Sequence, residues 1–319
     1  MPPIIYLDQN HWITLARARH ARHKVQHLDE LTAADAIWKM AANREIRLPL
    51  SVAHLVETAR AGGGQRRAEL ADTMLEAYHG WHMRHPVDVR AAEIAAVLSG
   101  EAADIEVFSR QPGTPFPSSQ FEPFHSADPE LTEDAQRLVD ALVWRDTWNF
   151  ALRHETQSSE QNKQADAVIE GWARSHQEFQ TYLAEHPAER DPRQVAAAWT
   201  LGDLHVEISM IAHNLGLSPE DFAATMRPDN VLSVFSAMPF IARVTEITHL
   251  RFRDPNDSWK RNDLNDLIYA ICAAGYADFV VADNKFAHLA NQASKHSPPG
   301  ATVTSNLRTL WADLQAAVS

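Results

Sequence analysis

The chain of 319 residues contains a single cysteine, Cys272, so it cannot form a disulfide bond within itself. This usage fits a reducing compartment, and we expect a cytoplasmic protein. The sequence shows no signal-peptide pattern and no uninterrupted apolar run of membrane-spanning length, so no membrane partner is expected. Cys272 lies in an apolar, helix-like run and is interpreted as a core residue.

Basic residues are also scarce, since 29 Lys and Arg against 42 Asp and Glu give a net charge of −13. This balance argues against a broad nonspecific grip on nucleic acid, which requires cations that displace counterions from phosphates. Any RNA contact must then be local. The candidate RNA-binding residues form an acid-free strip in "RARHARHK" and a pair near residue 260: Arg17, Arg19, Arg22, Lys24, Lys260 and Arg261. The alternative is that these side chains pair with surface carboxylates.

Short apolar runs alternate with helical patterns at both ends of the chain, which is typical of a parallel α/β sheet. The runs interpreted as strands lie at 4–7, 46–51, 85–89, 277–282 and 301–305. Helical periods are found at 11–20, 32–45, 51–61, 66–81, 287–296 and 307–318, with Thr32 as the expected N-cap of the second. We therefore expect the first and last parts of the chain to build one sheet together.

The sequence between about 95 and 250 has a different pattern. A Pro- and Ser-rich stretch at 109–130 predicts a loop, and long helical periods follow it. We predict a discontinuous α/β domain, 1–94 and 251–319, with a mostly helical insertion, 95–250, between its two parts.

Two of the predicted strands end on an acidic residue, Asp8 and Asp283. The carboxyl ends of parallel strands lie at one edge of a sheet, where ligands collect. Asp263 and Asp266 are three residues apart in "NDLND" and share a helix face, and Glu57 lies on the helix leaving the second predicted strand. Clustered carboxylates raise one another's pKa values, so they require a cation; oxygen-only ligands favour Mg²⁺ or Mn²⁺. Two such ions can hold both oxygens of a phosphoryl displacement.

Each acidic residue also has a simpler interpretation. Asp8 suits the N-cap of the first helix, and Asp263 or Asn262 suits a cap with Asp266 beside the positive end of its helix. Glu57 on its own is typical of a solvated helix residue. The order of all these positions along the chain favours a shared site.

With these residues in view, the sequence resembles a PIN domain. The resemblance rests on "YLDQN", on the acidic residue in the third helix-like element, and on the two aspartates at the ends of "DLIYAICAAGYADFVVAD". It covers roughly 1–90 and 255–319, and "RFRDPNDSWKRNDLNDLIYA" is similar to the lead-in of larger bacterial PIN-like proteins. The resemblance implies a three-layer α/β/α fold with a parallel sheet. It also implies a metal-dependent ribonuclease site of three or four carboxylates.

Position by position, the resemblance assigns Asp8, Glu57, Asp266 and Asp283 as the four catalytic acids, with Asp263 as a further metal ligand. Asn10 takes the place of the small polar residue that follows the first acid. The sequence departs from the family at Ala282, where Thr or Ser is common, and at the neutral Asn284. The carboxylates themselves are intact.

The predicted function is thus a Mg²⁺- or Mn²⁺-dependent PIN-like endoribonuclease that hydrolyses RNA, in a toxin or defence setting. Its expected partners are the RNA substrate and an antitoxin or another defence-system protein. The alternative is a PIN-like fold that has lost cleavage and serves as an RNA- or protein-binding module. The sequence carries no signal for the oligomeric state.

Overall fold

A computed structural model of the chain describes residues 1–60, 63–101, 105–118, 132–154, 159–186 and 191–318. Its central sheet has three parallel strands, β1 (Ile5–Leu7), β4 (Phe279–Val281) and β5 (Thr302–Thr304), in the order β1-β4-β5. Leu7 pairs with Val281, and Val281 with Thr304. The first and last parts of the chain therefore share one sheet, as predicted.

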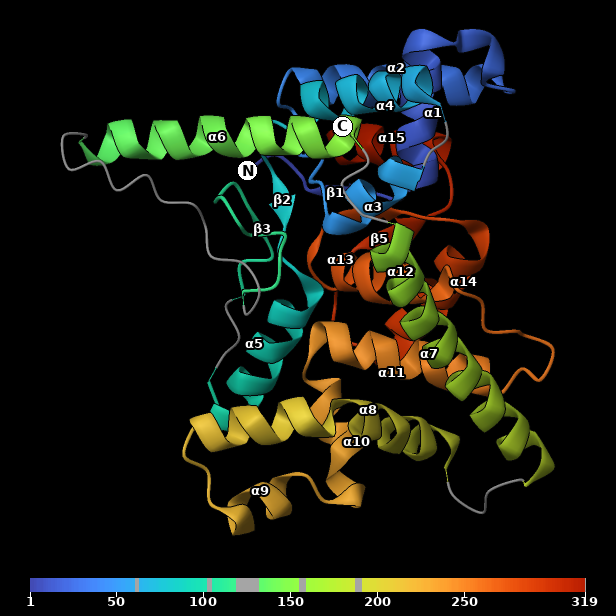
Figure 1. Ribbon diagram of the computed structural model, residues 1–319. Helices are drawn as coiled ribbons and strands as arrows, with labels where there is room; N and C mark the ends of the chain where they lie inside the picture. The colour runs from blue at the N-terminus through green and yellow to red at the C-terminus, as the bar shows by residue number, and fades with distance from the viewer. Residues whose placement is uncertain (61–62, 102–104, 119–131, 155–158, 187–190, 319) are drawn as a thin grey trace.

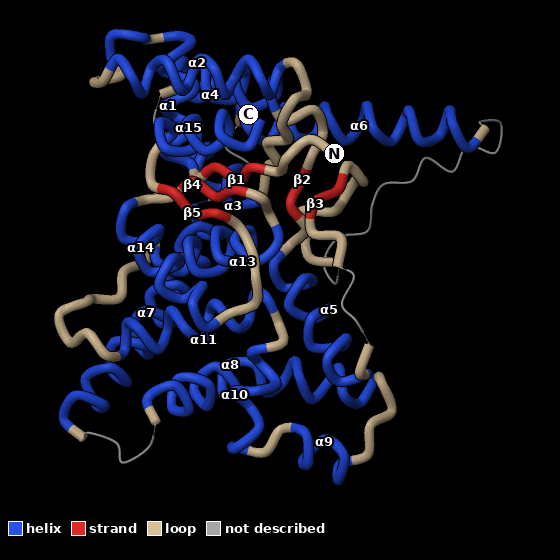
Figure 2. The backbone as a smooth tube through the Cα atoms, turned by 180° about the vertical axis from the view of Figure 1, so that it is seen from behind, coloured by secondary structure: helices blue, strands red, loops and turns tan. Residues whose placement is uncertain are grey.

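Helices cover both faces of this sheet (Figures 1 and 2). One side holds α1 (Gln9–His20), α2 (Leu28–Ala42), α4 (Gly64–Ala77) and α15 (Leu307–Val318). The other holds α13 (Ile271–Tyr276) and α14 (Asn284–Ala293). Every residue of β1 is buried, as expected of a parallel strand covered by helices on both sides. The architecture is a mixed α/β fold with a small parallel sheet.

The middle of the chain is mainly helical in its described residues. It contains α6 (Glu133–Arg153), α7 (Ser159–Glu185), α8 (Pro192–Asn214), α9 (Pro219–Thr225), α10 (Pro228–Ser236) and α11 (Pro239–Phe252). A small antiparallel ladder, β2 (His82–Met83) with β3 (Phe108–Ser109), joins its start to the preceding segment. Much of the predicted 109–130 loop lies outside the described residues. The domain boundaries stay a prediction.

Two predicted strands are wrong. Residues 46–51 form only isolated bridges, Ile4 to Arg47 and Leu50 to His82, because Pro49 has no N–H for a continuous ladder. Residues 85–89 instead begin the helix α5 (Pro86–Ser99), since Pro suits a first helical turn and the His85 side chain accepts the Val87 N–H.

The start of α2 also differs from the prediction. It begins four residues before Thr32, whose hydroxyl donates to the Leu28 carbonyl inside the helix instead of capping it. Two of the other predictions are met: Cys272 is fully buried, and the final helix spans Leu307–Val318. Within the described residues, no helix has the length and apolar character needed to cross a membrane.

One buried carboxylate, Glu93 of α5, connects three parts of the chain. It accepts the backbone N–H groups of Phe240 (2.6 Å) and Ile241 (3.1 Å) at the start of α11, and the hydroxyl of Tyr276 (2.5 Å). These N–H groups have no partner within their own helix. Glu93 therefore fixes α11 against both α5 and the end of α13.

Candidate active site

The strand ends bring two of the predicted acids together. Asp8 follows β1 directly, and Asp283 lies two residues beyond β4. The Asp8 N–H donates to the carbonyl of Val281 at 2.9 Å, which fixes both chain segments at the same edge of the sheet. The charge of Asp283 contributes to raising the pKa of Asp8, although burial is the larger cause.

The two aspartates use their side chains differently. Asp8 occupies the N-cap position of α1 but makes no capping hydrogen bond; its Oδ2 accepts instead from Asn10 Nδ2 at 3.3 Å. Asp283 does cap its helix, because its Oδ1 accepts the Phe286 N–H at 2.7 Å. Asp8 thus occupies the N-cap position of α1 without a capping hydrogen bond from its carboxylate. Asn284 is exposed at the first turn of α14.

Glu57 and Asp266 approach the same edge from other elements. Glu57 lies on α3 (Val52–Arg60), and the Asn265 side chain reaches it at 3.5 Å. Asp266 follows the short helix α12 (Asp263–Asn265) and begins η2 (Asp266–Ala270), a π-helical turn. Such turns widen a helix locally and occur often at functional sites.

The electrostatics link all four carboxylates. The pKa of Asp266 is raised to about 8, first by burial and then by the charges of Asp8, Asp283 and Glu57. Burial and the charge of Asp8 raise the pKa of Glu57 to about 7. In the cation-free protein the charges of these groups repel one another, and Glu57 and Asp266 hold protons near neutral pH.

The donor chemistry fits a divalent cation, although the described residues contain no three His, Cys, Asp or Glu side chains grouped so as to hold one. The four interacting carboxylates offer only oxygen, the ligand that Mg²⁺ and Mn²⁺ prefer. A cavity of about 20 Å³ borders Asp266 and Asp283, which is room for roughly one water-sized sphere.

Asp263, the fifth predicted ligand, is already engaged. Its Oδ2 accepts from Arg251 Nη2 at 2.8 Å and from the Lys260 N–H at 2.7 Å. Arg251 also binds Asp257 at 2.8 Å, and Lys285 Nζ donates to Asp257 at 2.6 Å. Asp263 thus belongs to an ion network beside the four other carboxylates.

Several neighbours of the site had no sequence signal. Arg251 is almost fully buried, with its guanidinium 3.6 Å from the Trp259 ring centroid. His11 is buried and lies 3.2 Å from the Ala282 carbonyl; burial lowers its pKa, so it is neutral at pH 7. His11 lies three residues after Asp8, and that proximity is the one sequence feature from which it could have been inferred.

The six predicted RNA-binding cations fall into two groups in the structure, those with an ion pair and those without one. Arg19 pairs with Glu76 at 2.6 Å, and Arg22 pairs with Asp35 at 2.8 Å. Arg261 pairs with Asp166 of α7. Arg17, Lys24 and Lys260 make no ion pair with another described residue. The alternative of carboxylate pairing thus holds for half of the set.

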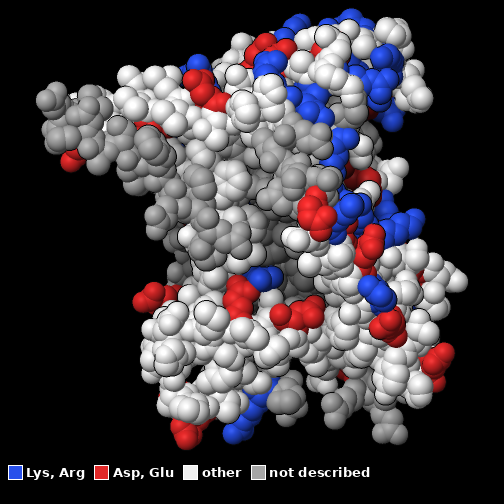
Figure 3. All heavy atoms as spheres, in the orientation of Figure 1, with Lys and Arg blue, Asp and Glu red and all other residues white. Residues whose placement is uncertain are grey.

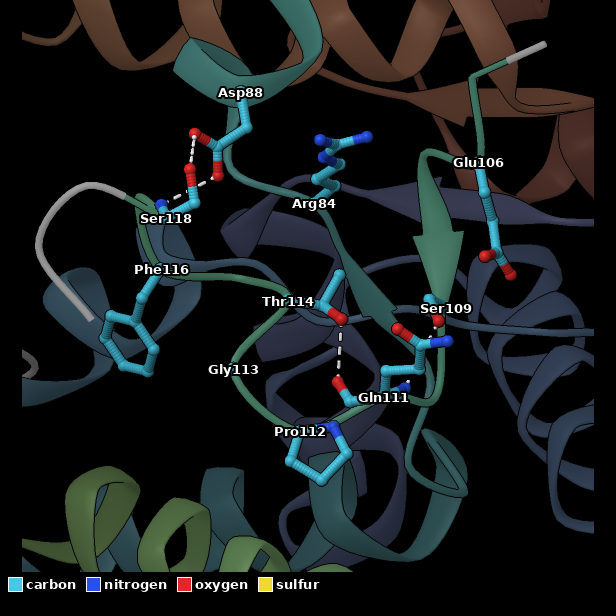
Figure 4. Close-up of a pocket in the computed structure, with 10 residues that line it drawn as sticks. All are labelled: Arg84, Asp88, Glu106, Ser109, Gln111, Pro112, Gly113, Thr114, Phe116 and Ser118. Carbon is cyan, nitrogen blue, oxygen red and sulfur yellow. Dashed lines mark hydrogen bonds between the residues drawn. The ribbon is translucent and has the colours of Figure 1, made fainter. Parts of the chain in front are cut away.

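A hollow of about 560 Å³ between β3 and the start of α5 is a separate feature (Figure 4). Arg84 points into it between Asp88 and Glu106, while Asp88 accepts from the Ser118 hydroxyl at 2.8 Å. None of the four candidate carboxylates lines this hollow.

Comparison with known proteins gave no match to a family model, to a curated protein or to a solved structure.

The raised pKa values predict how the metal-free protein responds to pH. Between about pH 4 and 9 the folded state binds more protons than the unfolded state at Glu57 and Asp266, so these two groups make stability fall as pH rises. Buried histidines such as His54, with a lowered pKa of about 4, act in the opposite direction until the unfolded chain has lost its histidine protons, at about pH 7.5. We therefore expect a loss on the order of 1 kcal/mol from pH 7.5 to 9.

Urea unfolding at the two pH values, with a chelator present, measures this loss. The matched variant is Asp266→Asn, which should show a smaller loss over the same interval because it removes the group with the highest carboxyl pKa. A wild-type stability that stays constant or increases from pH 7.5 to 9 would contradict the assignment of these protons.

Proposed function

We propose that the chain is a Mg²⁺- or Mn²⁺-dependent PIN-like endoribonuclease. The observation that carries the proposal is that Asp8, Glu57, Asp266 and Asp283, which come from four separate segments, interact electrostatically near the carboxyl edge of the parallel sheet. Helices on both faces of that sheet support the three-layer α/β/α arrangement that the resemblance implies.

The residues have distinct roles in this proposal. Asp8, Asp266 and Asp283, with Glu57, would hold the cation, and Asn10 orients the Asp8 carboxylate through its hydrogen bond. When bound, the cation would polarise the scissile phosphate and lower the pKa of an attacking water. His11 fixes the chain after β4 through Ala282, and Arg251 fixes the segment that leads to Asp266.

The test is incubation of the full chain with a mixed pool of single-stranded and structured RNA. We expect cleavage with Mn²⁺ or Mg²⁺ and none with a chelator, because the carboxylates alone supply no electrophile. Heat-denatured protein at the same metal concentration is the control for metal-driven hydrolysis. Absence of cleavage at every ion concentration would overturn the proposal.

The second candidate is an RNA- or protein-binding module with the same fold. The observation that favours it is that two of the predicted acids already have structural partners: Asp283 caps α14, and Asp263 is held by Arg251. It predicts RNA or protein binding without cleavage at any ion concentration.

An antitoxin or other defence-system partner is part of the first proposal and would cover the carboxylate edge.

A further inference from the structure

A pocket of about 210 Å³ lies between α1 and α4, outside the carboxylate site. Its apolar wall comes from Ile13, Ala16 and Leu70, the last two of which are buried. Lys24 belongs to the short helix η1 (Arg22–Lys24), which follows α1. The remaining lining residues are Arg17, Ala21, Arg66 and Glu69.

Three cations from three elements surround this pocket: Arg17 of α1, Lys24 of η1 and Arg66 of α4. All three are exposed, and none forms an ion pair with a carboxylate elsewhere in the described chain. Glu69 is the single acidic lining residue, and its Oε1 accepts from Gln65 Nε2 at 2.9 Å. The pocket thus has an excess of positive charge in a protein with a strong net negative charge.

The surface around the pocket supports this charge distribution. Lys and Arg side chains gather over α1, α2 and α4 in the space-filling view (Figure 3). Arg19 and Arg22, on the same segment, are neutralised by Glu76 and Asp35. The two cations of this segment that have no ion pair, Arg17 and Lys24, both line the pocket. Arg66 joins them from α4, a helix that the sequence did not connect with the strip.

We propose that this pocket binds a nucleotide phosphate. Guanidinium and ammonium groups recognise phosphate oxygens through charge-assisted hydrogen bonds. The wall of Ile13, Ala16 and Leu70 offers apolar surface for a base or sugar, which inorganic phosphate does not use. A ligand that has both a phosphate and an apolar group would use the cations and the aliphatic side chains that line this pocket.

The position relative to Asp8 assigns the nucleotide to the RNA strand. Arg17 lies nine residues along α1 from Asp8, which is roughly 13 Å at the rise of an α-helix. A phosphate in the pocket would then belong to a nucleotide away from the scissile bond. This assignment rests on the proposed nuclease function, whereas the nucleotide site itself does not.

Calorimetric titration of the metal-free full chain with adenosine 5′-monophosphate tests the site. We expect binding that is at least several-fold tighter than that of inorganic phosphate or adenosine, and that weakens from 50 to 200 mM salt. Arg17→Ser and Arg66→Ser should each lower the affinity about 10-fold. Arg174→Ser, which changes an exposed arginine on α7, is the matched control and should bind as wild type.

Absence of nucleotide binding, or equal binding by Arg66→Ser and wild type, would overturn the proposal. The RNA assignment has its own readout: Arg66→Ser should raise KM for RNA about 10-fold and leave kcat unchanged. An unchanged KM together with lost nucleotide binding would refute the RNA assignment and leave a site for free nucleotide. Nucleotide binding without any RNA cleavage would support the pocket and refute the nuclease proposal.

Discussion

Asp8→Asn is expected to lower metal-dependent RNA cleavage by about 100-fold or more, because one charged ligand is lost from the cation shell. The metal-free variant should be at least as stable as wild type. Asp8 raises the pKa values of Glu57 and Asp266, so its neutralisation relieves repulsion inside the cluster. Asn is also as good an N-cap residue as Asp, so the start of α1 should be unaffected.

Cleavage rate and melting temperature, measured on the same preparations, separate the two effects. Asp146→Asn, at an exposed aspartate on α6, is the control and should change neither quantity. An Asp8→Asn protein that cleaves normally but melts at a lower temperature would reduce Asp8 to a structural role at the start of the helix.

Arg251→Met should destabilise the protein by about 3–5 kcal/mol, the typical cost of removing one member of a buried ion pair. The side chain is 3% exposed and binds both Asp257 and Asp263, which are 15% and 14% exposed. Methionine keeps a side chain of similar length but loses the guanidinium that lies over the Trp259 ring. Both carboxylates lose their main ionic partner, and Lys285 is the cation that remains beside them. Urea unfolding measures the difference.

The control is Arg137→Met, which breaks the exposed pairs with Glu133 and Asp134 and should cost less than about 1 kcal/mol. Adding Asp263→Asn to Arg251→Met should recover part of the loss, because one unpaired buried charge disappears. A destabilisation by Arg251→Met below 1 kcal/mol would contradict the role assigned to this network.

The sheet was predictable where one local signal decided the structure. The apolar runs that form β1 and β4 are buried on both faces, and each is followed closely by an aspartate. The errors arose where two signals competed. Val87 and Val89 favour a strand, but Pro86 fixes a helical φ and the His85 side chain caps the first turn. Around Pro49, the apolar run gives bridges to two partners but no ladder.

The candidate site was predictable only in its acids. Asp8 and Asp283 follow from strand position, and Asp266 and Glu57 from their order in the chain. Arg251 has no such signature, because an arginine near a helix end is usually solvent-exposed. The division of the basic strip also depends on tertiary partners: Arg19 lies 3.9 Å from the Trp38 ring centroid and pairs with Glu76, which are distant in sequence.

The buried carboxylate of Glu93 bears on whether the predicted parts of the chain can fold independently. It lies at the end of the first predicted segment, whereas its partners belong to the predicted insertion and to the returning segment. Excision of the predicted insertion, 95–250, would leave the first-turn amides of α11 without this acceptor, and the rejoined segments 1–94 and 251–319 would keep Glu93 with Tyr276 alone. We therefore expect the helical part and the sheet to unfold together in one cooperative transition.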